Sequence, residues 1–549
     1  MHKSLLLLFL SVFAGFAIGQ QSASSENTTI HATTRWVLIN VVATDKQGHP
    51  IQDLKREDFT ILENGKPQKL ASFSLEQMKE RTGPAGTRSL PEHIYTNRPD
   101  YNTLAGPLTL VLIDELNTPW QDQAYARRQL LDYVGKQNHF SQPVAIMVLR
   151  DSLSLLQNFT TDSRPLTEAV RRYKPGLSDL DIVSLPVFPV NLRLRQQVND
   201  EHVAFDNDRR VAMTLAAFRV IARAMAGYPG RKKMVWVSAG IPAAFFPRAQ
   251  SSLGSAHLYT DDIRQTDNLL TDAQVSVYSI DARGLSTLDF GYQGTAPSYS
   301  SFAGIPGPSL ERAVAANELY DSQAAMKEIA EQTGGRDYTN QNDIARLLEH
   351  SMSDGNLYYA LAYAPQGKKW DGGFRKIQVK VDRKDLELRY RRGYFATEPL
   401  LKNSDNKDQD AELMAALRGG ALPATMVWFD TRIVPTAGSE QPSHVTIDTR
   451  IYSQTVPCEA QTDGAHRCNV ELHIAAISRD GNVVTHDDKK LESTISASTY
   501  DVIRQRGFPF HSQFALQPGD YQICFAVRDN QTGSVGTLQV PLTIKPLAQ

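Results

Sequence analysis

Cysteine is scarce in this chain, with three in 549 residues. No cysteine or histidine spacing resembles that of a structural zinc site, which argues against a zinc-stabilised fold. Cys458 and Cys468 flank the turn Thr462-Asp463-Gly464, which would hold them near each other across a hairpin. In an oxidising compartment we therefore predict a disulfide between them, with Cys524 buried and free, although spacing alone does not fix the connectivity.

The chain also has little net charge and few long apolar runs. A formal net charge of −2 gives no reason to expect nucleic acid or an anionic membrane surface as a partner. The longest apolar run, residues 5–17, follows Lys3 and precedes small residues. It predicts a signal peptide over residues 1–19 and an exported mature chain, periplasmic or extracellular, without a membrane span. A retained signal anchor is the alternative, but the run is short for crossing a bilayer.

The motifs of common hydrolases and nucleotide-binding enzymes are missing. There is no Gly-x-Ser-x-Gly elbow, no His-Glu-x-x-His and no Gly-x-x-x-x-Gly-Lys phosphate loop. The histidines are scattered, and no nucleophile stands beside a base in a recognisable pattern. We predict that the protein is not an enzyme. A hydrolase that uses carboxylates at strand ends stays open as an alternative.

The chain is too long for a single hydrophobic core. The patterns predict a small β-sandwich unit at 28–78, an α/β domain at 105–355, a β extension at 356–397 that packs on the N-terminal β unit, a polar linker at 398–411, and an immunoglobulin-like β-sandwich at 412–549. Residues 79–104 are rich in Pro, Gly, Thr and Arg, which favours a linker or surface loop.

The central region alternates strands with helices. Residues 108–113 form an apolar run with the length and branched content of a strand buried on both faces. Together with the later apolar runs it predicts a doubly wound, mainly parallel sheet of Rossmann type. Ligands of such sheets bind beyond the carboxyl ends of the strands, so Asp114, Asn117 and Thr118 should lie at the mouth of any site.

Six segments between residues 35 and 396 resemble the acidobacterial-type VWFA-related domain family, a branch of the von Willebrand factor A superfamily. The match is carried, in this order, by residues 41–59, 113–118, 159–162, 230–242 (Gly-Arg-Lys-Lys-Met-Val-Trp-Val-Ser-Ala-Gly-Ile-Pro), 277–285 (Val-Tyr-Ser-Ile-Asp-Ala-Arg-Gly-Leu) and 358–395. The resemblance implies a VWA-like fold and an extracytoplasmic setting. It implies little about activity.

The resemblance also implies a metal site for Mg²⁺ or Mn²⁺, built from an Asp-x-Ser-x-Ser turn, a distant Thr and an Asp after the fourth strand. Asp114 and Thr118 match the first and last positions of that turn, whereas Leu116 supplies no hydroxyl and Ala239 stands near the place of the later acid. A site reduced in this way should bind Mg²⁺ weakly, because Mg²⁺ demands several oxygen ligands.

Other oxygens could rebuild a degenerate site. Asp162 and Asp281 are the candidates that complete a set with Asp114 and Thr118, and Glu115 or Asn117 are further options. The alternative is that Asp114 caps a helix or accepts loop amides, and that Asp281 pairs with Arg283. We therefore expect no required cofactor, with weak Mg²⁺ or Mn²⁺ binding as the open possibility.

A loop at 286–307 is rich in Gly, Ser, Tyr and Pro. Its aromatic residues, Tyr292, Tyr299 and Phe302, together with Asn117, suit contact with a partner protein. A disordered solvent loop is the equal alternative. The sequence thus predicts an exported protein for protein–protein recognition or adhesion, with an envelope hydrolase or a purely structural envelope component as the other readings.

Overall fold

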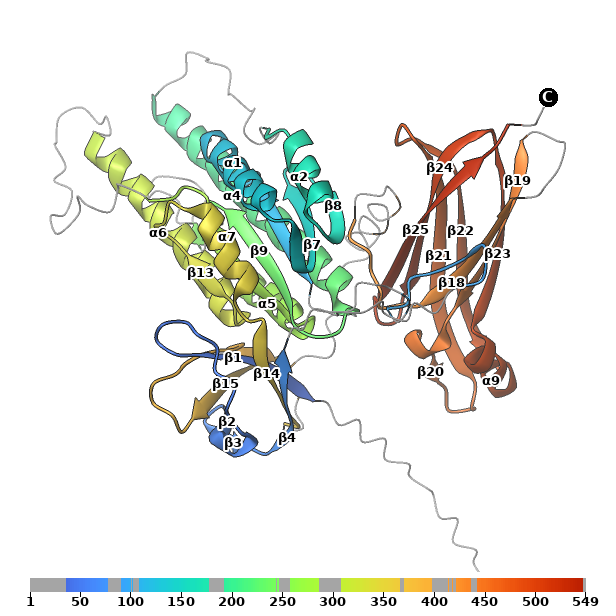
Figure 1. The fold of residues 1–549 in the computed structure, drawn as a ribbon, viewed down its shortest axis with the longest axis horizontal. Helices are drawn as coiled ribbons and strands as arrows, with labels where there is room; N and C mark the ends of the chain where they lie inside the picture. Colours follow the sequence, from blue (N-terminus) through green and yellow to red (C-terminus); the bar gives the residue numbers. More distant parts are fainter. Residues whose placement is uncertain are drawn as a thin grey trace, which may run out of the picture.

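The computed structural model describes residues 36–77, 90–99, 101, 108–176, 192–242, 244–245, 257–285, 308–365, 370–396, 413, 417, 421–435 and 442–546. The predicted signal peptide (1–19), the linker at 398–411, and Tyr292, Tyr299 and Phe302 lie outside these residues. Figure 1 shows a central α/β domain with one β-rich unit below it and a second beside it. Among the described helices, none is both long and apolar enough to span a membrane.

The α/β domain is built on a six-stranded sheet with the order β13-β12-β9-β6-β7-β8. The strands are β6 (Thr109–Asp114), β7 (His139–Leu149), β8 (Leu153–Asp162), β9 (Lys232–Ser238), β12 (Val275–Asp281) and β13 (Arg336–Tyr338). All neighbours are parallel except β8, which runs antiparallel to β7. β6, β9 and β12 are buried along their whole lengths, as the apolar runs predict.

Helices cover both faces of this sheet (Figure 1). They are α1 (Trp120–Lys136), α2 (Ser163–Arg172), α4 (Leu192–Ala226), α5 (Thr260–Asp272), α6 (Pro308–Gln332) and α7 (Ile344–Ser353). Leu110 and Leu112 of β6 pack with residues of α4, α5 and α6. The alternate residues Val111 and Ile113 pack with α1, α2 and α7. The two-residue period of a strand thus places one core on each face, which makes the domain doubly wound.

The N-terminal β unit combines segments from both sides of the α/β domain. One sheet has the order β16-β1-β14-β4 and the other β17-β15-β2-β3. Their bounds are β1 (Val37–Thr44), β2 (Phe59–Glu63), β3 (Lys66–Gln68), β4 (Leu70–Gln77), β14 (Leu357–Tyr363), β15 (Phe374–Val381), β16 (Glu387–Arg389) and β17 (Gly393–Phe395). The two sheets share one hydrophobic core, so the unit requires residues that precede and follow the α/β domain.

The β unit lies at the amino ends of the parallel strands. The backbone N–H of Arg231, just before β9, donates to the Tyr358 hydroxyl of β14 at 3.2 Å. The Arg231 guanidinium donates to the Gly334 carbonyl at 2.8 Å and to the Tyr278 hydroxyl at 3.2 Å. The carboxyl ends therefore face away from this unit, on the side where α4 and α6 project beyond the sheet (Figure 1).

The C-terminal unit is antiparallel. Its sheets contain β18 (Phe429–Pro435), β19 (Ser443–Ile451), β20 (Glu459–Ala460), β21 (His466–Ser478), β22 (Val483–Ile495), β23 (Phe508–Leu516), β24 (Gly519–Asp529) and β25 (Val535–Ile544), with α9 (Ala497–Arg506) between β22 and β23. The predicted disulfide joins Cys458 to Cys468, and Cys524 is free and buried in β24.

One short strand departs from the expected linker at 79–104. β5 (Ile94–Thr96) pairs antiparallel with β18 of the C-terminal unit. Asn97 fixes this segment, because its side-chain amide donates to the Val427 carbonyl at 2.8 Å and accepts from the Phe429 N–H at 2.9 Å. Its partners follow more than 300 residues later, so the local sequence did not predict the pairing.

Candidate functional site

The strand order places a candidate site between β6 and β9. The chain first builds the sheet outward from β6 through β7 and β8, and then outward from β9 through β12 and β13. Helices at this switch point diverge to opposite faces, and ligands of open α/β sheets bind there, beyond the carboxyl ends. Asp114 ends β6, Ser238 ends β9 and Asp281 ends β12 beside Ser238. We call the ends of these three strands and the loops that follow them the carboxyl edge.

Asp114 is fully buried at the centre of this edge. One carboxylate oxygen accepts from the backbone N–H and the side-chain amide of Asn117, both at 3.1 Å. The other accepts from the Asn117 amide at 2.8 Å, the Trp236 indole at 3.0 Å and the Ser238 hydroxyl at 2.7 Å. Burial raises the pKa of Asp114, while these hydrogen bonds act in the opposite direction. Asp114 therefore matches the alternative stated from the sequence, in which its carboxylate accepts hydrogen bonds from loop amides instead of binding a metal.

The Asp114 network ties the ends of β6 and β9 together. Thr118 accepts a hydrogen bond from the Ala239 N–H at 3.2 Å through its side-chain oxygen. The Ser238 hydroxyl, which donates to Asp114, accepts from the Gly240 N–H at 2.8 Å. The Leu116 side chain is buried in the core and does not reach the edge. The turn after β6 is therefore held by hydrogen bonds to its neighbour strand.

Asp281 is also buried and fully engaged. The Arg283 guanidinium donates two hydrogen bonds to its carboxylate, from Nε at 2.8 Å and from Nη2 at 2.9 Å. The side-chain amide of Gln323 in α6 donates a third at 2.9 Å. A forked pair of this kind fixes both carboxylate oxygens. The structure thus brings Asp114, Thr118 and Asp281 to one edge, but each already has protein partners.

Asp162 does not belong to this edge, contrary to the predicted ligand set. β8 runs antiparallel to β7, so its last residue, Asp162, pairs with His139 at the start of β7. Asp114 pairs with Leu149 at the opposite end of β7. β7 is eleven residues long, so its two ends lie roughly 30 Å apart at the rise of a strand. Asp162 instead caps α2, accepting from the Arg164 N–H at 2.9 Å.

The residues present do not fit a Mg²⁺ or Mn²⁺ site. These ions need several oxygen lone pairs in near-octahedral array. At Asp114 and Asp281 those lone pairs accept from indole, guanidinium, amide and hydroxyl groups, and the first two can only donate. Within the described part of the chain, no group of three or more His, Cys, Asp and Glu side chains is arranged to hold a metal. The carboxylate oxygens that a metal would need already accept hydrogen bonds from protein groups.

Glu115 forms a further buried network that the sequence did not predict in detail. Its carboxylate pairs with the Arg150 Nε at 2.5 Å and accepts from the Gly176 N–H at 3.1 Å. It also accepts from the Tyr173 hydroxyl. Burial and then this hydrogen bond raise the pKa of Tyr173. Glu115 therefore holds the loop after β7 and the segment after α2 against the end of β6.

Three segments next to the buried polar groups of the edge each carry an exposed apolar side chain. Trp120, at the start of α1, is 48% exposed, Leu285 after β12 is 49% exposed, and Tyr320 of α6 is 50% exposed. Gln323, one turn along α6 from Tyr320, contacts Asp281. Burial raises the pKa of Asp122 in the first turn of α1, and the nearby charges of Arg283 and Asp281 lower and raise it, respectively. We call Trp120, Leu285 and Tyr320 the apolar rim. Sequence reasoning missed Trp120, although it follows the Asp114 turn directly.

Comparison of the chain with protein-family models and with curated proteins finds no match. Among solved structures, it is similar to an aerotolerance-related membrane protein from Bacteroides fragilis, with 13% identity over 45% of this chain and 98% of that chain (TM-score 0.25). It is also similar to proximal thread matrix protein 1 from the mussel byssus with a zinc-occupied MIDAS motif, with 10% identity over 50% of each chain (TM-score 0.23).

A further similar structure is the ArnB paralog VWA2 from Sulfolobus acidocaldarius, with 10% identity over 86% of this chain and 75% of that chain (TM-score 0.21). The structures similar to this chain thus include a VWA-type protein. At these TM-scores the likeness carries no argument about the site. The architecture of the central domain rests on its own strand order, a mixed, mainly parallel six-stranded sheet flanked by β-rich regions.

Proposed function

We propose that this chain is an exported VWA-related protein that binds another protein through the apolar rim of its carboxyl edge. The observation that supports this most is the exposure of Trp120, Leu285 and Tyr320 around strand ends whose carboxylates are already paired. Large side chains with few rotatable bonds provide contact area at low entropic cost. Hydrogen-bonded loops beneath them reduce the ordering that binding would require.

The same geometry is unfavourable for catalysis, so we propose a binding protein in preference to a hydrolase. A general base must reach its proton with a free lone pair. Asp114 and Asp281 are both buried, and their oxygens accept from Trp236, Ser238, Asn117, Arg283 and Gln323. We favour binding over a purely structural role because large apolar side chains are exposed on the segments that follow β6 and β12 and on α6, and exposed apolar groups can mark an interaction site.

We also propose that binding needs no metal ion. Addition of Mg²⁺ or Mn²⁺ should leave the melting temperature of the purified protein unchanged, because a ligand that binds the folded state would raise it. Differential scanning calorimetry with either ion, and with a chelator, measures this. A rise in melting temperature that saturates with Mn²⁺ and disappears in Asp114→Ala would contradict the proposal.

Crosslinking from the rim tests the recognition surface itself. A photoreactive phenylalanine analogue at position 120 or 285 should capture a defined protein in a native envelope extract, equally with and without chelator. Position 36 is the matched control, because Trp36 is 56% exposed but lies on the N-terminal β unit. The same captured protein at positions 36 and 120 would show non-specific contact, and no capture at 120 or 285 would count against the rim.

Two alanine variants distinguish the loss of a contact with the partner from a loss of folding. We expect Trp120→Ala to remove the captured protein from position 285 while the melting temperature stays close to that of the native chain, since about half of this side chain is exposed. Trp36→Ala should leave capture unchanged. If capture persists in Trp120→Ala, the partner binds elsewhere.

A further inference from the structure

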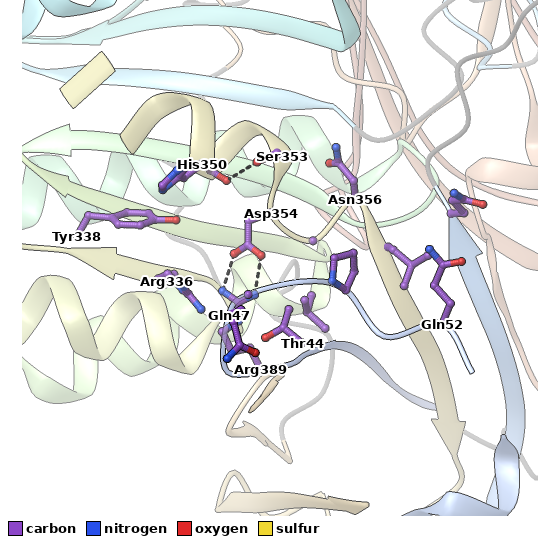
Figure 2. Close-up of a pocket in the computed structure, with 16 residues that line it drawn as sticks. Thr44, Gln47, Gln52, Arg336, Tyr338, His350, Ser353, Asp354, Asn356 and Arg389 are labelled. Atoms are coloured by element: carbon purple, nitrogen blue, oxygen red, sulfur yellow. Dashed lines mark hydrogen bonds and ion pairs between the residues drawn. The ribbon is translucent and has the colours of Figure 1, made fainter. Parts of the chain in front are cut away.

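A cavity of about 520 Å³ lies between the N-terminal β unit and the α/β domain (Figure 2). β1, the turn after it and β16 form the side that belongs to the β unit. β13 and the last residues of α7 form the side that belongs to the α/β domain. The volume lies within the usual range for ligand pockets, which often occur where domains meet.

Two residues that line this cavity each have a buried polar atom without a hydrogen-bond partner, just beneath the cavity surface. The Thr44 side chain is 3% exposed, and its hydroxyl makes no hydrogen bond. The Nε of Arg389 is also buried and unpartnered, while its two terminal nitrogens both bind Asp354 at 2.5 Å. Buried polar atoms are nearly always paired. A guanidinium nitrogen can only donate, so the missing partner at Arg389 is a hydrogen-bond acceptor.

The charge of the cavity also favours an acceptor with negative charge. Arg389 and Asp354 neutralise each other in a buried pair. Arg336 lines the same cavity, and its contact is a 3.3 Å pair with Glu387, whose side chain is 54% exposed. An exposed pair of this kind is weak and exchanges readily for a better partner. Arg336 thus offers a planar donor group that matches a carboxylate.

Apolar side chains complete the wall. Val42, Pro50 and Leu357 line the cavity beside the polar groups. A small inorganic anion would satisfy the donors but leave these surfaces and most of the volume without contact. An organic molecule with an apolar body would bury them, with a gain of about 25 cal/mol for each Å² of apolar surface removed from water.

We propose that this cavity binds a small organic carboxylate with an apolar body. The carboxylate accepts hydrogen bonds from Arg336, and from the Thr44 hydroxyl and the Arg389 Nε after small side-chain shifts that bring these two buried atoms to the cavity surface. The body lies against Val42, Pro50 and Leu357. Such a ligand bridges the β unit and the α/β domain, so its binding stabilises their contact.

Isothermal titration calorimetry of the mature full-length protein with benzoate, cinnamate and hexanoate tests this proposal. At least one should bind with saturable heat, and the neutral analogue of the same body, such as benzyl alcohol for benzoate, should bind at least about tenfold more weakly, a difference of 1.4 kcal/mol. A parallel titration with inorganic phosphate tests whether the cavity instead binds any small anion. No saturable heat with any of the three carboxylates, or equal binding of acid and alcohol, would overturn the proposal, as would phosphate binding more tightly than every carboxylate.

Three variants assign the contacts. Arg336→Gln should weaken carboxylate binding about tenfold and Thr44→Val several-fold, as expected for the loss of hydrogen bonds to a charged group. Arg383→Gln is the control, because Arg383 forms an exposed pair with Asp53 outside the cavity lining. Thr44→Val breaks no hydrogen bond within the protein, so the unliganded variant should keep or raise its melting temperature. Unchanged affinity in both cavity variants would show that the carboxylate binds elsewhere.

Discussion

Asp114→Ala should lower the free energy of unfolding by roughly 3–5 kcal/mol, with or without divalent metal ions. The reason is that the substitution leaves buried donors without an acceptor: the Trp236 indole, the Ser238 hydroxyl and the Asn117 amide. It also releases the turn after β6 from β9. Chemical denaturation in chelator, followed by tryptophan fluorescence, measures the change. A residue that served only as a metal ligand would give the opposite result, since its removal relieves charge in the metal-free protein.

Asp162→Ala is the matched control for that experiment. Asp162 is an aspartate at a strand end that was also predicted as a ligand, but it caps α2 and pairs with Arg164. We expect a much smaller loss of stability than for Asp114→Ala. If the metal-free Asp114→Ala protein were as stable as the native protein, the hydrogen-bond network would not hold the edge.

Stability should rise with pH between about 7 and 10 because of two buried lysines at the start of β9. Burial lowers the pKa of Lys232 and of Lys233 to about 7 from an ordinary 10.5. Between these values the unfolded chain holds protons that the folded chain has released, so the free energy of unfolding increases with pH. Each lysine contributes a slope of roughly 1.4 kcal/mol per pH unit, and the gain is absent below pH 7.

Lys233→Met should reduce this slope by roughly 1.4 kcal/mol per pH unit when unfolding is followed between about pH 7.5 and 9.5. The fold should tolerate the change, because the Met352 carbonyl, which accepts from Lys233 at 2.6 Å, also accepts from the Gln142 amide at 2.9 Å. The second acceptor, the Asn356 side-chain oxygen at 2.7 Å, belongs to a residue that is only partly buried. Lys380→Met, at an exposed lysine of β15, is the control. Equal slopes in the native protein and in Lys233→Met would mean that Lys233 remains charged in the folded state.

Local patterns predicted most of the secondary structure that forms the site. The apolar run at 108–113 corresponds to β6, whose last residue is Asp114, and the turn between Cys458 and Cys468 lies within the disulfide-bonded segment. The carboxyl ends of parallel strands lie at one edge of a sheet. Two aspartates that each end a parallel strand, Asp114 and Asp281, are therefore expected at the same edge. Period and turn chemistry are local properties, which is why they can be read without the tertiary structure.

The position of Asp162 depends on the direction of β8 relative to β7. Only Arg150, Asp151 and Ser152 separate β7 from β8. Parallel neighbours need a crossover of a dozen or more residues, so this connection permits only an antiparallel pair. The sequence therefore contained the signal that Asp162 lies at the opposite edge. It contained no comparable signal for β5, whose partners lie far along the chain.

The sequence by itself determined an α/β domain with flanking β regions, the position of Asp114 at a strand end and the pairing options of the cysteines. Only the tertiary structure decided what Asp114 does. The Trp236 indole and the Ser238 hydroxyl come from β9, more than 120 residues away, and they fill the lone pairs that a metal would need. The cavity at Thr44 and Arg389 likewise combines segments that are distant in sequence. Hydrogen-bond partners and cavities arise from packing between elements, and no local pattern encodes them.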